Sequence, residues 1–160
     1  MQSKSIQELI NFILLAKQAT YVGGGDKLLP YRLGSHDLQF FKDNWAYHDS
    51  YFGASDFIGE ETVYYHGKVV WGMNYFRRIL HPEKITSAQA GVIIQQSLLK
   101  MYQSGRFLGG FQNAVGEFNY TDTNEGDPLY FTGREWIEFK DETVYQLVYH
   151  GGLVNEQTSI

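Results

Sequence analysis

Two glutamates in matching aromatic surroundings are the residues of this sequence best suited to chemistry. Glu61 and Glu135 each end a Phe-x-Gly-x-Glu motif, and the two motifs lie 74 positions apart. A carboxylate among apolar residues costs several kcal/mol unless it is paired or hydrogen-bonded, and aromatic rings around it attract organic cations. We therefore interpret both glutamates as acids that face a cationic ligand. The alternative is structural: such a glutamate is tied to backbone N–H groups or to Arg77 or Arg78.

Aromatic residues follow both motifs and supply the apolar part of the candidate site. A two-residue turn at residues 66–67 would place Glu61 opposite Gly72, and a turn at residues 140–141 would close a second hairpin. In that register the aromatic residues lie on the other side of the sheet from both glutamates. The predicted ligand-binding residues, located where the two halves of the chain meet, are Glu61, Glu135, Trp71, Tyr75, Trp136, Tyr145 and Tyr149.

A histidine and nearby carboxylates offer a second kind of chemistry. The expected register of the first hairpin puts Asp37 and His48 on one face, as an acid–base pair or half of a metal site without a third ligand. The corresponding enzymatic hypothesis is a hydrolase or isomerase that uses His48, Asp49 and Glu61. Residues 35–37 read Ser-His-Asp, but neighbours on an extended chain point to opposite sides, so they form no catalytic relay.

The amino-acid composition limits the classes of function that this chain can have. The chain of 160 residues contains no cysteine, which excludes disulfides, thiolate nucleophiles and cysteine-based metal centres. Its formal net charge is −5 and it has no dense Lys/Arg block, so we expect no nucleic-acid surface on this chain. No run approaches the ~20 apolar residues of a membrane helix, and the N-terminus lacks a signal-peptide pattern. We expect a cytoplasmic protein that holds no metal or cofactor.

Two helices and two sets of strands must position these residues. Apolar residues at helical spacing predict one helix over residues 6–19. A capping box at Thr86 and Gln89 begins a second helix that ends near Gly105. Alternating residues predict four strands in each half of the chain. The three glycines at 23–25 predict a flexible loop, because the lysine and hydroxyl residue of a phosphate-binding motif do not follow them.

The order of these elements predicts an α+β fold, an antiparallel sheet built from two pseudo-repeats of one helix plus four strands. The pseudo-repeats span about residues 5–80 and 86–152 of a single domain, 1–160. The constant offset of the two Phe-x-Gly-x-Glu regions supports the repeat. A Tyr-x-Asp motif at residues 47–49 also returns at residues 120–122. The alternative is that two aromatic hairpins look alike without being related.

Several strings, in order along the chain, resemble a bacterial and archaeal domain family of unknown function. They are Ala16-Lys17-Gln18-Ala19-Thr20-Tyr21, Gly34-Ser35-His36-Asp37-Leu38, Asp49-Ser50-Tyr51-Phe52-Gly53, Phe57-Ile58-Gly59-Glu60-Glu61, Trp71-Gly72-Met73-Asn74-Tyr75 and His150-Gly151-Gly152. Members of that family occur alone or behind a helix-turn-helix DNA-binding domain. The resemblance therefore implies a stand-alone domain whose relatives act as the sensing halves of regulators, and it implies no activity. Residues 105–110 depart from the family's usual pattern.

The predicted architecture is also similar to the drug-sensing domains of some bacterial regulators. Those domains hold cationic aromatic ligands in a cleft between two halves, against a buried glutamate. This likeness is one of fold alone and assigns no function by itself.

Three functional hypotheses follow from the sequence. The first is a non-enzymatic, sensor-type domain that binds a small molecule, possible ligands being cationic aromatic compounds. The second is an interaction module that forms a homodimer through an aromatic sheet face containing Trp71. The third is the hydrolase or isomerase described above.

Overall fold

The computed structural model describes residues 3–22 and 28–155, with side chains for residues 6–20 and 28–155. The elements are α1 (Ser3–Lys17), the π-helical turn η1 (Gln18–Val22), β1 (His36–Lys42), β2 (Trp45–Gly53), β3 (Phe57–Tyr65), β4 (Lys68–Ile79), α2 (Ser87–Gln103), β5 (Phe111–Val115), β6 (Phe118–Asp127), β7 (Tyr130–Phe139) and β8 (Glu142–Leu153). The predicted glycine loop at 23–25 lies outside the described residues. Within the described ranges, no helix is long and apolar enough to cross a membrane.

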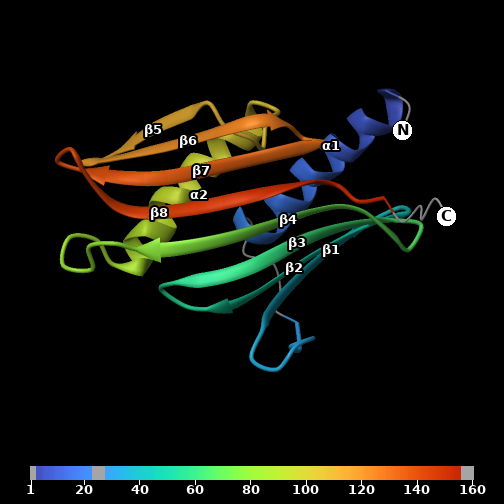
Figure 1. The fold of residues 1–160 in the computed structure, drawn as a ribbon, viewed down its shortest axis with the longest axis horizontal. Helices are drawn as coiled ribbons and strands as arrows, with labels where there is room; N and C mark the ends of the chain where they lie inside the picture. Colours follow the sequence, from blue (N-terminus) through green and yellow to red (C-terminus); the bar gives the residue numbers. More distant parts are fainter. Residues whose placement is uncertain (1–2, 23–27, 156–160) are drawn as a thin grey trace.

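All eight strands join one antiparallel sheet, in the order β1-β2-β3-β4-β8-β7-β6-β5 (Figure 1). Its two halves meet where β4 pairs with β8, from Trp71 opposite Leu153 to Ile79 opposite Tyr145. Strands hold 52% of the residues and helices only 22%. The predicted α+β class, with two units of one helix plus four strands, is therefore wrong. The fold is dominated by a single sheet, because β4 and β8 pair along most of their length and leave no boundary between two units.

Two of the predicted hairpin turns are confirmed by their backbone geometry. His66 and Gly67 join β3 to β4 with φ of 49° and 75°, and Lys140 and Asp141 join β7 to β8 with φ of 51° and 62°. Positive φ at both central residues gives the two-residue turn whose twist matches that of paired strands. Each turn therefore sends its second strand directly back along the first.

A β-bulge between Val63 and Tyr64 changes the register predicted for β3 and β4. Glu61 lies opposite Met73, whereas an uninterrupted hairpin would place it opposite Gly72. A slip of one residue moves every side chain of a strand to the other face of the sheet. Trp71 and Tyr75 of β4 therefore lie on the face that carries Glu61, which corrects the predicted separation.

A matching bulge between Ile137 and Glu138 changes the register of β7 and β8. Glu135 lies opposite Leu147, so Tyr145 and Tyr149, each two residues from Leu147, share the face of Glu135. The prediction that placed these tyrosines on the other face is wrong for the same reason. Both bulges follow their turns closely, and each redirects a whole strand.

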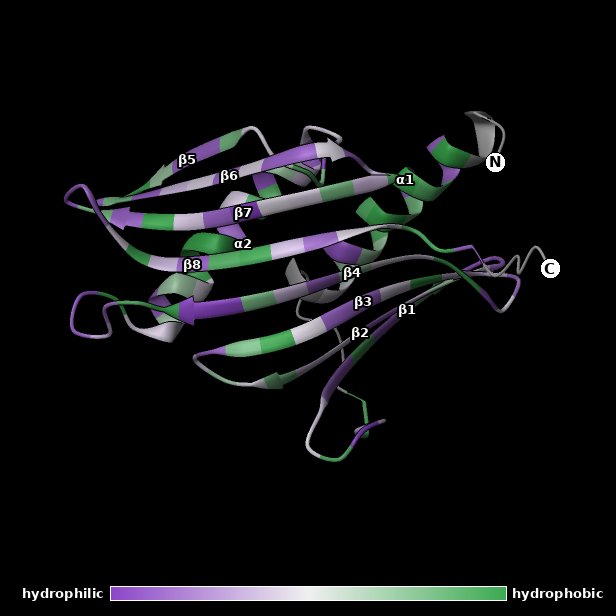
Figure 2. Cartoon of the chain, viewed as in Figure 1, coloured by the Kyte–Doolittle hydropathy of each residue, from purple (hydrophilic) through white to green (hydrophobic). Residues whose placement is uncertain are grey.

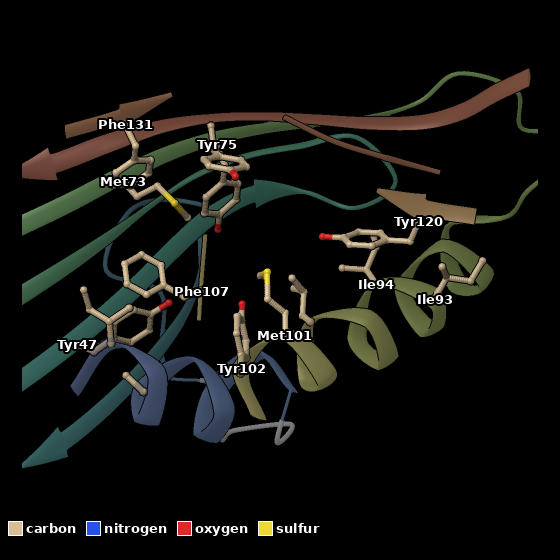
Figure 3. Packing of buried hydrophobic residues seen from close by; sticks show 14 of the residues in the cluster. Tyr47, Met73, Tyr75, Ile93, Ile94, Met101, Tyr102, Phe107, Tyr120 and Phe131 are labelled. Carbon is tan, nitrogen blue, oxygen red and sulfur yellow. The ribbon is translucent and has the colours of Figure 1, made fainter. Parts of the chain in front are cut away.

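Both helices lie on one face of the sheet, which we call the helix-covered face (Figure 1). α1 packs against β1 and β2, α2 packs against β5 and β6, and both helices contact η1. The predicted capping box of α2 is confirmed: Gln89 N donates to Thr86 Oγ1 at 3.2 Å and Thr86 N donates to Gln89 Oε1 at 2.9 Å. Figure 3 shows Ile94, Met101 and Tyr102 extending from α2 toward the strands.

The opposite side of the sheet, which we call the open face, carries exposed apolar side chains. Ile58 on β3, Phe76 on β4 and Val148 on β8 lie opposite one another in a row and are 56%, 43% and 46% exposed. Hydrophobic and hydrophilic residues alternate along the strands (Figure 2), as expected where only one face of a sheet is covered.

Candidate functional site

A cavity of about 580 Å³ lies between the helix-covered face of the sheet and the two helices. Its lining contains four acidic side chains and two basic ones, Asp49, Glu61, Asp122, Glu135, Lys17 and Arg77. Each of these six residues is at most 7% exposed. Tyrosines, phenylalanines and aliphatic residues form much of the remaining wall. Ionisable groups this deeply buried are paired, neutralised by a proton or bound to a ligand, because desolvation of a charge is costly.

The first acid pair consists of Asp49 on β2 and Glu61 on β3, which lie opposite each other in the sheet. Lys17, at the end of α1, donates to Glu61 Oε1 at 2.7 Å and lies 2.6 Å from Oε2. Asp49 accepts a hydrogen bond from the Tyr75 hydroxyl at 2.5 Å. Burial and the nearby charge of Glu61 raise the pKa of Asp49 to about 7, although Tyr75 and Lys17 oppose the rise. Glu61 thus forms an ion pair with a lysine, whereas Asp49 accepts a hydrogen bond from a tyrosine.

The second acid pair consists of Asp122 on β6 and Glu135 on β7, which are also cross-strand partners. Tyr149 donates to Asp122 Oδ1 at 2.9 Å, Tyr120 donates to Glu135 Oε2 at 2.5 Å, and Tyr145 donates to Glu135 Oε1. Burial, then the charge of Glu135, raises the pKa of Asp122 to about 7. Burial also raises the pKa of Glu135, while its two tyrosines lower it. In the described part of the chain, no basic residue forms an ion pair with either acid.

The glycine of each Phe-x-Gly-x-Glu motif makes room for a tyrosine that reaches an acid. A Cβ added to Gly59 would collide with the end of the Tyr75 side chain, and one added to Gly133 would collide with the ring of Tyr149. Both tyrosines therefore lie across a glycine before their hydroxyls meet the aspartates. The motif therefore supplies both the glutamate and the space beside the glycine that the tyrosine ring occupies.

Arg77 is the second buried cation, and it is anchored away from the acids. Its guanidinium group lies over the rings of Phe57 and Tyr145, at 4.8 Å and 5.1 Å from their centroids. Nη2 donates to the carbonyl and the hydroxyl of Ser87 at 3.3 Å and 3.2 Å. Its charge lowers the pKa of Glu135 at longer range. Arg77 therefore links β4 to the start of α2.

The structure brings five of the seven predicted ligand-binding residues into the cavity wall, Glu61, Glu135, Tyr75, Tyr145 and Tyr149. Trp71 is fully buried beside the cavity, where its indole N–H donates to the Pro128 carbonyl at 2.9 Å. Trp136 lies elsewhere: it is on the open face of β7, with the guanidinium group of Arg134 4.7 Å from its ring centroid.

The structural alternative for Glu61 needs a different partner from the predicted one. Lys17, and neither Arg77 nor Arg78, forms its ion pair. Arg78 instead lies 3.8 Å from Asp56. The sequence did not reveal this partner of Glu61, because Lys17 lies 44 residues away from it along the chain.

His48 lies on the open face, separated by the sheet from Asp49 and Glu61. The predicted pairing with Asp37 is present: His48 Nε2 is 2.9 Å from Asp37 Oδ1. Burial alone would raise the pKa of Asp37, but hydrogen bonds, first from Ser35, hold it below its ordinary value. The hydrolase set is therefore not assembled in one place. Among the described residues, no group of three or more His, Asp or Glu side chains could hold a metal ion.

Four charged residues of the cavity were absent from the predicted ligand-binding set: Lys17, Arg77, Asp122 and Asp49, the last of which was predicted only for the hydrolase. Lys17 follows Ile13 by four positions on the buried side of α1, so helical spacing could have indicated its direction. Asp122 repeats the Tyr-x-Asp motif that contains Asp49, which was a usable signal. Arg77 carries no comparable motif.

Comparison with known proteins places the chain in a family. The profile described as "Domain of unknown function (DUF5680)" matches residues 49–154. That segment holds all four acids of the cavity and Arg77, while Lys17 precedes it. No curated protein and no solved structure matches the chain. Because the matched segment covers more than half of the sequence, the chain belongs to the DUF5680 family of domains of unknown function.

Proposed function

We propose that this protein is a non-enzymatic, sensor-type domain that binds a small organic cation with an aromatic or apolar body. One observation carries the proposal: four buried acids and two buried bases, Lys17 and Arg77, line a cavity with many aromatic residues, together with the exposed His36. Lys17 neutralises Glu61 and Arg77 contributes one further positive charge. If all four acids ionise, two negative charges remain without a compensating cation. A cationic ligand would supply what the buried carboxylates lack.

The cavity also suits the apolar part of such a ligand. Its volume of about 580 Å³ lies within the range of roughly 300–1,000 Å³ that small-molecule sites occupy. Phe57, Tyr75, Phe107 and Tyr149 contribute ring surfaces to the lining. Aromatic faces near a desolvated cation are worth about 1 to 2 kcal/mol each. Charge and apolar surface thus favour the same class of compound.

The hydroxyl groups of the site favour binding over turnover. The phenols of Tyr75, Tyr120 and Tyr149 already donate to carboxylates. Burial, and then the neighbouring carboxylates, raise the pKa of all three tyrosines above its ordinary value, so the phenols stay protonated and are weak nucleophiles. The same bonds fix the acids in position before a ligand arrives, which reduces the entropic cost of binding.

The setting of this binding is part of the proposal. A ligand-binding domain fits the sensing half of a regulator, which is what the resemblance to bacterial and archaeal domains beside helix-turn-helix segments implies. Its site of action is then the cytoplasm.

Calorimetric titration tests the proposal with matched compounds. Phenethylamine and tryptamine carry the cation, and 2-phenylethanol and indole-3-ethanol are their neutral counterparts. We expect the amines to bind and the alcohols to bind at least about tenfold more weakly. Asp122→Asn is expected to weaken amine binding by about tenfold, whereas Glu60→Gln, an equal change of charge at an exposed residue, is expected to leave it unchanged. Equal binding of amines and alcohols would contradict the proposal.

A second candidate function rests on the open face. The exposed row of Ile58, Phe76 and Val148 is the apolar surface that a homodimer could cover. The predicted dimer residue Trp71 lies instead in the core, so it reports on folding and not on association. Light scattering on the wild type and on Phe76→Asp tests this candidate: a dimer that the substitution converts to a monomer supports it, and a wild-type monomer excludes it.

A further inference from the structure

The two acid pairs of the cavity are built alike. In each, an aspartate and a glutamate face each other across neighbouring antiparallel strands. In each, a tyrosine that lies across a glycine donates to the aspartate, Tyr75 to Asp49 and Tyr149 to Asp122. Two similar sets of groups should therefore bind similar partners. The first pair shows which partner this is, because its glutamate holds the primary ammonium group of Lys17.

The second pair lacks such a partner because of the helix that covers it. α2 packs against β5 and β6, and the residues it adds to the cavity wall are all uncharged, Ile94, Gln95, Leu98, Met101 and Tyr102. The basic residue in the last turn of α2, Lys100, is exposed and donates to Asn113 Oδ1 at 2.7 Å. Where α1 presents a lysine to its acids, α2 thus presents only uncharged side chains to the cavity.

Arg77 does not take the place of that lysine. Its guanidinium group is held between Phe57 and Tyr145, and it donates to Ser87 at the start of α2. It forms no ion pair with Asp122 or Glu135 within the part of the chain that the structure describes. The acids of the second pair are therefore oriented by tyrosines, and Lys17 and Arg77 act on them through their charges without forming an ion pair with them.

We propose that Asp122 and Glu135 form the cation subsite of the cavity and that the subsite takes a primary ammonium group, in the manner in which Glu61, beside Asp49, takes Lys17. This inference rests on the proposed ligand-binding function and names its ligand class, an amphipathic primary amine. A primary ammonium has three N–H donors for carboxylate oxygens, whereas a quaternary ammonium has none. Its apolar body would lie along the aliphatic surface of Leu98 and Met101.

Two substitutions at one position test the subsite directly. Leu98→Lys would supply from α2 the ammonium group that α1 supplies to the first pair, and Leu98→Met is the uncharged control of similar length. We expect Leu98→Lys to weaken phenethylamine binding by at least about tenfold more than Leu98→Met does. Wild-type affinity in Leu98→Lys, with the fold retained by circular dichroism, would overturn the inference.

The ligand and the acids give an independent test, which holds even if Leu98→Lys does not fold. We expect the wild type to bind phenethylamine at least about tenfold more tightly than its N,N,N-trimethyl analogue, and Glu135→Gln to lose this preference. Equal affinity for the two amines, or a preference that survives in Glu135→Gln, contradicts the subsite while leaving the proposed function in place. If the wild type binds neither amine, the proposed function fails as well.

Discussion

Asp122→Asn should change how the stability of the ligand-free protein depends on pH. Asp122 is 3% exposed, and burial together with the charge of Glu135 raises its pKa from 3.8 to about 7. Between about pH 4 and pH 7, the native state therefore holds a proton that the unfolded chain has already released. Stability falls with rising pH wherever the native state binds more protons. The contribution of this group is complete below pH 4 and lost as the pH passes 7.

The magnitude follows from the size of the shift. A rise from 3.8 to about 7 corresponds to an upper limit of about 4 kcal/mol. Structural relaxation and water entry reduce the cost of a buried charge, so we expect about 1 to 2 kcal/mol at pH 8. Asparagine resembles the protonated acid and keeps an oxygen for the hydroxyl of Tyr149. Asp122→Asn should therefore match the wild type near pH 3.5 and exceed it by this amount at pH 8.

Urea unfolding between pH 3.5 and pH 8 measures the difference. Thermal unfolding should show the same trend, with the midpoint of Asp122→Asn about 2–8 °C higher at pH 8. Glu60→Gln controls for the loss of one negative charge, because Glu60 is exposed on the open face. A difference between Asp122→Asn and the wild type that is constant across the pH range would refute the reasoning, since it would mean that the pKa of Asp122 is not raised.

Two further predictions concern the construction of the site. Gly133→Ala should destabilise the protein by about 1 to 3 kcal/mol in urea unfolding, because the new methyl group displaces the ring of Tyr149. The control Gly91→Ala, in a helix with open space around it, should be neutral or stabilising. Equal effects of the two substitutions would contradict the packing of Tyr149 against Gly133. Lys17→Met should lower the free energy of unfolding by about 3 to 5 kcal/mol, because it leaves Glu61 buried without its cation. Adding Glu61→Gln should restore much of the lost stability. A double variant no more stable than Lys17→Met would argue against the ion pair.

Local features of the fold could be predicted from the sequence because their causes are local. The turn at His66 and Gly67 follows from the residue types that tolerate positive φ. The start of α2 follows from a capping box within four residues, Thr86 to Gln89. In both cases, groups close together in the chain satisfy each other's backbone. No distant partner is needed to decide the outcome.

The fold class and the faces of the strands depended on information that short segments do not contain. The pairing of β4 with β8 joins residues more than 60 positions apart, such as Ile79 and Tyr145, and it is this pairing that makes one sheet of the two halves. The bulge at Val63 adds one unpaired residue and exchanges the faces of β4. Alternation alone could not reveal the bulge, because both faces of these strands contain apolar residues. The composition of the candidate site was therefore predicted better than its geometry.

Protons and an organic cation compete for the same acids in this cavity, and that competition links its electrostatics to its proposed role. Asp49 and Asp122 both have a pKa raised to about 7 by burial and by the glutamate beside each of them. Below that pH the aspartates reduce their charge by holding protons, and above it they gain charge that only a cation can offset at low cost. A bound ammonium group favours the ionised form, so protons must leave as it binds. The ammonium group of Lys17, held in place by α1, already offsets the charge of Glu61. The fold therefore accommodates an ammonium group beside one of these acids.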